Sequence, residues 1–389
     1  MEAAINELDQ WLRHEFVDLN TELEEAYFAA RAEILDGPDL EKIKQAIAVD
    51  GARLIARIAE AGRIPADAQE RYRLLGAVGF YLAACRRHEV EPVGESLVPA
   101  WSLANRLGSS LGVAPRYVFA HQSIHNPAVR GTFLTFTSLH DEQVFIVHNG
   151  LAVLAYQRAA DALRRIPPMG ISNPMAAYLL EQARAALDDV LRFNRTLADE
   201  LDPDRFFFNI RPYFKTYRVG AAEYRGANAG DFAAVNEIDL LLGLCAAEDP
   251  FYQHVVTEKY PYVPPEDQAP LQAAALAEPL LDVILHEATS GSIGERLRRN
   301  GELFLAVCRS HAAAYTYHHH RLVKPFLERP AEDAPQDRRE DLTASGPPLD
   351  VVIGGLARLS DLRAGRDRPG LRTAGASLDR LRALLATGP

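Results

Sequence analysis

Apolar positions along the 389-residue chain follow a helical pattern through most of its length. They recur every three to four residues, which is the spacing of one helix face. Residues 131–147 depart from this pattern, because β-branched and aromatic residues lie on both sides of His140-Asp141-Glu142, and we predict a small hairpin there. The predicted helices cover 1–34, 39–61, 65–85, 96–113, 115–124, 150–165, 175–200, 203–208, 231–247, 268–288, 297–324 and 376–386. The chain is therefore predicted to be an all-α protein.

A polar, proline-rich segment interrupts the pattern at residues 329–349. Such a composition cannot form an apolar core, so we predict a linker there and a C-terminal helical tail over 350–389. The chain is long enough for two cores or for one large helical body.

Composition narrows the class of partner. The net charge is -11, which argues against nucleic acid or an anionic membrane as the main partner. Three cysteines without C-x-x-C spacing suggest neither a disulfide framework nor a zinc knuckle, so a cytoplasmic location is expected. The first residues are charged and lack an apolar signal region, and no run of eighteen apolar residues is present.

Three consecutive histidines lie near the end of the predicted helix 297–324. Neighbours on a helix point in different directions, and only His319 shares its face with mainly apolar residues. His319 is thus the candidate metal ligand. His318 is the fallback, since a shift of one residue in helix phase would exchange the two, and His320 is expected in solvent. The alternative is an ordinary core histidine flanked by two solvated ones.

A phenylalanine run at 206–208 precedes Arg211. An arginine among aromatic rings is costly unless an anion meets it, and its planar fork suits a carboxylate. The alternative is an arginine that reaches solvent or pairs with Asp202, Asp204 or Glu237.

A second candidate segment is the loop Gly226-Ala-Asn-Ala-Gly230. Its small residues allow the backbone to approach a ligand closely. The spacing of its glycines is not that of a dinucleotide or phosphate fingerprint.

Several motifs occur in a fixed order along residues 70–330. They are VFAHQSIHNP (118–127), P-x-x-FF-x-x-x-R (203–211), RPYF-x-x-YRVG (211–220), G-x-x-AG (226–230), DLLLG (239–243) and KYPYVPP (259–265). Together they resemble the haem-dependent superfamily of indoleamine 2,3-dioxygenase and monodechloroaminopyrrolnitrin synthase. The resemblance implies a two-domain helical fold, with a small N-terminal domain (1–128) and a large haem-binding domain (129–328).

The resemblance also implies roles for single residues. His319 would be the axial ligand of a haem b iron, with Gly226 and Gly230 beside the cofactor. Arg211 would hold the carboxylate of an aromatic amino acid. The pocket around that substrate would be formed by Phe206, Phe207, Phe119, Ser123 and the main chain of Asn228 and Ala229.

Two positions depart from the dioxygenase pattern. Thr316 replaces a basic residue three positions before the axial histidine, so contacts to the haem propionates must differ. His148 falls where the dioxygenases place a distal phenylalanine, and a histidine there could act as a catalytic base. The alternative for His148 is a surface position at a helix start. His121 and His125 have zinc-compatible i, i+4 spacing, but no third ligand lies nearby in the sequence.

We therefore expect a haem-dependent oxygenase that acts with O2 on tryptophan or a tryptophan-derived amino acid. One alternative is a haem-dependent hydroxylase or ring-rearranging enzyme of natural-product biosynthesis. A non-catalytic haem-binding sensor or scaffold is a third possibility. The oligomeric state stays open, with a homodimer as one candidate.

Overall fold

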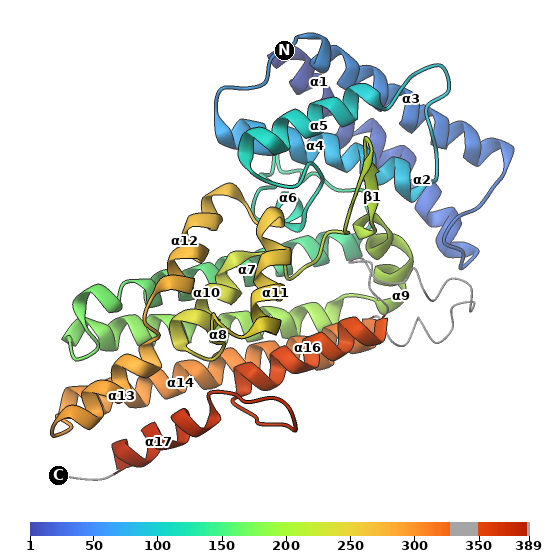
Figure 1. Ribbon diagram of the computed structural model, residues 1–389. Helices are drawn as coiled ribbons and strands as arrows, with labels where there is room; N and C mark the ends of the chain where they lie inside the picture. The colour runs from blue at the N-terminus through green and yellow to red at the C-terminus, as the bar shows by residue number, and fades with distance from the viewer. Residues whose placement is uncertain (327–348, 387–389) are drawn as a thin grey trace.

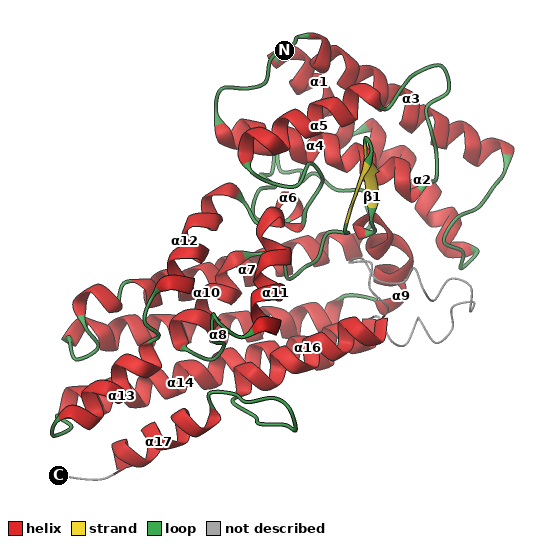
Figure 2. Cartoon of the chain, in the orientation of Figure 1, coloured by secondary structure: helices red, strands yellow, loops and turns green. Residues whose placement is uncertain are grey.

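The computed structural model describes residues 1–326 and 349–386, and it confirms an all-α protein. Helices dominate the described residues, as Figure 2 shows, and the only named sheet among them has two strands. The N-terminal helices are α1 (Glu2–Arg13), α2 (Glu15–Ala29), α3 (Pro38–Glu60), α4 (Ala68–Arg87), α5 (Val98–Leu111) and the single turn α6 (Phe119–Gln122). The later helices are α7 (His140–Arg164), α8 (Pro174–Glu200), α9 (Pro203–Arg205), α10 (Ala233–Leu242), α11 (Pro250–Lys259), α12 (Pro265–Leu276), α13 (Leu280–Ser290), α14 (Glu295–His318), α16 (Leu349–Ala364) and α17 (Gly375–Ala386).

The helices form two groups (Figure 1). Helices α1 to α5 gather at one end of the molecule. In the larger group α7 packs against α8, α8 against α14, and α14 against α16. The domain boundary at residue 128 stays a prediction. The predicted linker lies almost wholly within 327–348, outside the described residues.

Local signals explain where several helices begin and end. Asp67 caps α4 by accepting a hydrogen bond from the Glu70 N–H, and Asn173 caps α8 in the same way through the Met175 N–H. Helix α5 ends at Gly112, which has a positive φ of 69°. The start of α8 is therefore readable in the sequence, since a proline follows its Asn cap.

A buried carboxylate joins the two groups of helices. Glu24 of α2 accepts hydrogen bonds from Arg87 of α4 at 2.8 and 2.9 Å, from Tyr213 at 2.6 Å and from Asn209 at 2.9 Å. Tyr213 and Asn209 flank Arg211 in the chain. The N-terminal helices thereby fix the segment that carries the candidate carboxylate-binding arginine.

The predicted hairpin at 131–147 is wrong. Residues from His140 onward are the first turns of α7, and only an isolated bridge pairs Val129 with Thr132. The polar residues at 140–142 begin a helix, where acidic side chains favour the positive end of the helix dipole. Glu142 turns back to accept the backbone N–H groups of Phe136 and Thr137 at 2.8 and 2.7 Å.

The strands lie elsewhere. Strand β1 (Tyr217–Val219) pairs antiparallel with β2 (Ala222–Tyr224), and Tyr217 lies opposite Tyr224. The resemblance marked this stretch as a motif, but the apolar pattern did not indicate strands of only three residues.

Gly79 of α4 lies where that helix meets the segment that leads to α6. A Cβ at this position would lie 2.9 Å from the Cα of Tyr117 and closer still to its backbone nitrogen. The Tyr217 hydroxyl donates to the Gly79 carbonyl at 3.2 Å and accepts from the Tyr117 N–H at 2.8 Å. Gly79 therefore sets how closely α4 approaches the chain just before Phe119.

Replacement of Gly79 by alanine should destabilise the protein by about 3 kcal/mol, since backbone rather than a flexible side chain must move. Equilibrium unfolding in urea measures this change. Gly354→Ala is the matched control, because Gly354 is exposed on α16 with nothing within 4 Å of the added Cβ. That control should be neutral or should stabilise by up to about 1 kcal/mol. Equal unfolding free energies for the two variants would contradict the packing argument.

Candidate active site

A large apolar cavity lies within the larger group of helices. Its empty volume is about 1630 Å³, including space at its open side. The side chains that line it are mostly apolar. The lining comes from α7, α8, α14 and α16 and from the segments 206–214 and 227–235.

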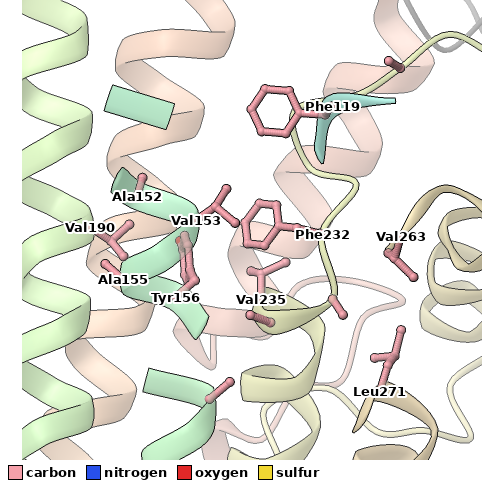
Figure 3. Close-up of a cluster of buried hydrophobic side chains, with 14 of the residues drawn as sticks. Phe119, Ala152, Val153, Ala155, Tyr156, Val190, Phe232, Val235, Val263 and Leu271 are labelled. Carbon is pink, nitrogen blue, oxygen red and sulfur yellow. The ribbon is translucent and has the colours of Figure 1, made fainter. Parts of the chain in front are cut away.

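One face of α7 forms a wall of this cavity. Phe145, Asn149, Ala152, Val153 and Tyr156 line it, and their spacing is that of a single helical face. Figure 3 shows Val153 and Tyr156 gathered with Phe232 and Val235 of the facing segment. The wall is therefore mostly hydrocarbon, which excludes water from whatever occupies the cavity.

His319 lies on the cavity wall where α14 passes into the π-helical turn His319–Val323. Its side chain is 2% exposed, and its Nδ1 is buried with no hydrogen-bond partner among the described residues. Burial lowers the pKa of the imidazole, with His320 and Lys324 acting in the same direction. The ring is therefore neutral at neutral pH, the form that ligates a metal. A buried neutral imidazole on an apolar cavity would suit the iron of a haem.

His318 also lines the cavity, and burial lowers its pKa to about 4. It is more exposed than His319, whereas His320 is in solvent as expected. Within the described residues no group of three or more histidine, cysteine or acidic side chains could hold a metal ion. The three histidines thus do not form a joint metal site.

Arg211 is 2% exposed and lines the same cavity. It follows a second π-helical turn, Phe206–Ile210, a rare element that is frequent at functional sites. The guanidinium lies 4.2 Å over the ring of Phe207 and donates to Glu33 at 3.0 Å. The alternative partners considered from the sequence have other contacts. Asp202 accepts the Arg205 N–H, Asp204 pairs with Arg31, and Glu237 lies 3.5 Å from Arg164.

Glu33 is shared by two cations. Lys215 donates to the same carboxylate oxygen at 2.8 Å. Burial would raise the pKa of Glu33, but Lys215 and Arg211 hold it at about 2. Glu33 is thus a common partner of Arg211 and Lys215 among the described residues.

The aromatic residues named from the sequence separate into two sets. Phe206 and Phe119 line the cavity, and Phe206 lies 5.5 Å from the Phe145 ring. Phe207 is not part of the lining and instead lies beneath the Arg211 guanidinium. Ser123 is also outside the lining, and its hydroxyl donates to the Phe119 carbonyl at 2.9 Å. Ser123 thus supports the turn that presents Phe119.

The small-residue loop contributes Asn228, Ala229 and Gly230 to the cavity, but not Gly226. Asp231 accepts the Asn228 N–H at 2.9 Å and is itself bound by Arg225 through two hydrogen bonds. The loop backbone is therefore held in one conformation against the cavity.

The structure does not bring His148 to the cavity. It lies in the third turn of α7, not at a helix start, and its Nε2 lies 3.5 Å from the Glu200 carboxylate of α8. The cavity face of α7 passes through positions 145, 149 and 152, and residue 148 is on the adjacent face. His121 and His125 likewise have separate partners, the Val118 N–H and Glu266.

Two cavity cations were not predicted from the sequence. Arg363 of α16 and Lys259 of α11 both line the cavity. The available signal was the spacing of Val352, Leu356, Leu359 and Arg363, which places an arginine on an otherwise apolar helix face. The C-terminal segment is therefore part of the cavity wall and not a detached tail.

Comparison with known protein families gives a match over nearly the whole chain. The model of the family described as monodechloroaminopyrrolnitrin synthase PrnB covers residues 2–385. No described helix is long and apolar enough to cross a membrane. The match extends beyond the motifs seen in the sequence and includes α16 and most of α17. The chain therefore belongs to the monodechloroaminopyrrolnitrin synthase family of haem-dependent enzymes.

Proposed function

We propose that this protein is a haem-dependent oxygenase that acts on tryptophan or a tryptophan-derived aromatic amino acid. One observation carries the proposal: a buried neutral imidazole, His319, and a buried arginine, Arg211, lie on the walls of the same large apolar cavity. The first suits the iron of haem b, and the second suits a carboxylate.

Each residue has a distinct task in this proposal. His319 holds the iron as its protein ligand, and bound haem supplies the chemistry of O2. Arg211 fixes the substrate carboxylate, and Phe119 and Phe206 pack on its aromatic ring. Orientation of this kind accounts for a large part of the rate enhancement in two-reactant steps.

Charge favours Arg211 as the carboxylate-binding group. Glu33 occupies one side of its guanidinium but also binds Lys215. A planar guanidinium has five N–H donors, so Arg211 can bind a substrate carboxylate together with its protein partners. An aromatic amino acid is thus favoured over an uncharged aromatic compound.

Family membership favours a second candidate, a haem-dependent ring-rearranging enzyme or hydroxylase of natural-product biosynthesis. It requires the same haem and the same amino-acid site. It differs in how many oxygen atoms the product gains. The position of His148 outside the cavity gives no support to a distal base at that residue.

An anaerobic titration of the ferrous haem protein with tryptophan tests the proposal. We expect the Soret band to shift on binding, and the product mass after O2 is admitted distinguishes the gain of two oxygen atoms, one or none. A haem protein whose Soret band does not change with any aromatic amino acid, and which forms no product, would instead be a sensor or scaffold.

The variant His319→Ala should lose the spectrum of histidine-ligated haem, because the remaining cavity wall offers no equally buried imidazole. Absorption spectra of the ferric and ferrous forms measure this change. His320→Ala is the matched control, since that neighbour is exposed and should leave the spectra unchanged. A normal spectrum for His319→Ala and a lost one for His318→Ala would transfer the ligand role to His318.

Replacement of Arg211 by methionine should weaken tryptophan binding about tenfold to a hundredfold. This range corresponds to the loss of roughly 1.5–3 kcal/mol, the usual contribution of hydrogen bonds to a charged group. Glu33 keeps Lys215 as its partner in this variant, so no carboxylate is left unpaired. Lys215→Met is the control, because it removes a charge from the same cluster without altering the cavity wall. If Arg211→Met binds tryptophan as tightly as the wild type does, the carboxylate lies elsewhere.

A further inference from the structure

Arg363 has a hydrogen-bond donor for which the described residues supply no acceptor. It belongs to the last turn of α16, is 2% exposed and lines the cavity. Its Nε and Nη2 donate to Asp239 at 2.8 and 2.6 Å. Its Nη1 is buried and makes no hydrogen bond with the described residues. Leaving such a donor unmatched costs roughly 1–3 kcal/mol, more for a charged group.

Asp239 cannot supply the missing acceptor. Besides Arg363, its Oδ1 accepts from His311 Nε2 at 2.8 Å, and its Oδ2 accepts from the Tyr252 hydroxyl at 2.8 Å. Each oxygen therefore already receives two hydrogen bonds, which fills the capacity of a carboxylate. Tyr315, whose ring lies 3.9 Å from the Arg363 guanidinium, lines the same cavity, so a further acceptor for Arg363 would enter from the cavity side.

Lys259 brings a second positive charge to the same network. Its Nζ donates to Asn236 at 3.0 Å, and Asn236 donates to the Tyr252 hydroxyl at 2.9 Å. Burial lowers the pKa of Lys259 to about 8, so the ammonium is mostly charged at neutral pH. Among the charged groups that act on Lys259, Arg363 and Arg225 are positive and Asp231 and Asp239 are negative, so with Lys259 itself three positive charges face two negative ones.

We infer that Arg363 and Lys259 form a carboxylate-binding site on the cavity wall, separate from the cluster of Arg211, Glu33 and Lys215. A buried excess of positive charge is stable only with an anion nearby, and a guanidinium with a free N–H suits a carboxylate. A hydrogen bond also joins α16 to α14 near this site. The hydroxyl of Ser360, one turn before Arg363, lies 3.2 Å from the hydroxyl of Thr316 in α14.

The inference rests on the proposed function, which brings two sources of carboxylate into the cavity. One is a propionate of the haem, and the other is the carboxylate of the amino acid. Both groups offer Arg363 a carboxylate. A haemin whose propionates are esterified and an amine without a carboxylate distinguish the two sources.

The experiment compares the wild type with Arg363→Lys and Lys259→Met. Lysine at 363 can still pair with Asp239 but has no second nitrogen for the cavity. Apoprotein is titrated with haemin and with its propionate dimethyl ester, followed by Soret absorbance. The haem-loaded protein is then titrated with tryptophan and with tryptamine, which has no carboxylate. Arg358→Lys is the control, since Arg358 lies on the same helix over Phe251 and outside the cavity.

If a propionate is bound, Arg363→Lys should weaken haemin binding about tenfold and leave binding of the ester unchanged. If the amino acid is bound, haemin affinity should persist while tryptophan affinity falls about tenfold and tryptamine affinity does not. Either result supports the site. Lys259→Met should lose affinity for the same ligand as Arg363→Lys does. If circular dichroism shows that Arg363→Lys does not fold, the titrations of Lys259→Met test the site instead.

Unchanged affinities for haemin and tryptophan in folded Arg363→Lys and Lys259→Met would overturn the inference and leave the proposed function intact. Failure of the wild type to bind haemin would overturn the proposed function, and this inference with it. The two failures are therefore distinguishable in one set of titrations.

Discussion

The cavity depends on one buried carboxylate, Asp239. Burial would raise its pKa, but Arg363 and His311 hold that pKa well below its ordinary value. Its carboxylate accepts four hydrogen bonds, one from Tyr252 of α11, one from His311 of α14 and two from Arg363 of α16. One charge on α10 therefore holds three other helices around the cavity. Removing one partner of such a pair is costly, roughly 3–5 kcal/mol, because the other charge stays buried. Stability and site geometry are therefore set by the same interaction.

Glu24 has a corresponding role for the segment that carries Arg211. It binds Arg87 of the N-terminal helices and two side chains that flank Arg211. Helices α1 to α5 thus act on the site without lining it, since they determine where the segment 206–214 lies. The cavity lining is mostly apolar, and Arg211, Lys259 and Arg363 are the charged side chains in it. An apolar cavity with a few fixed polar groups is the usual form of a cofactor and substrate site.

Particular residues show how far sequence reasoning extends to the site. His319, Arg211, Phe206, Phe119, Asn228 and Ala229, named from helix phase and resemblance, lie at one cavity, although their roles remain proposals. Phe207 and Ser123 instead support neighbours, and His148 faces Glu200. These three residues were assigned wrongly to the cavity because a motif shows only which residues are close in the chain. The direction of each side chain depends on the local backbone turn. Thr316, which the sequence marked as a departure, contacts the helix that supplies Arg363.

The sequence by itself determined the helical class, most helix positions and the family, because apolar periodicity and short motifs are local properties of the chain. It was wrong at 131–147, where β-forming residues precede the start of α7. Only the tertiary structure decided which charges meet. Asp239 and Arg363 are 124 residues apart, and Glu24 and Tyr213 are 189 apart. Such long-range pairs leave no periodic pattern in the sequence, because each helix contributes only one residue to a pair. The burial that makes a partner necessary arises only after the helices have packed.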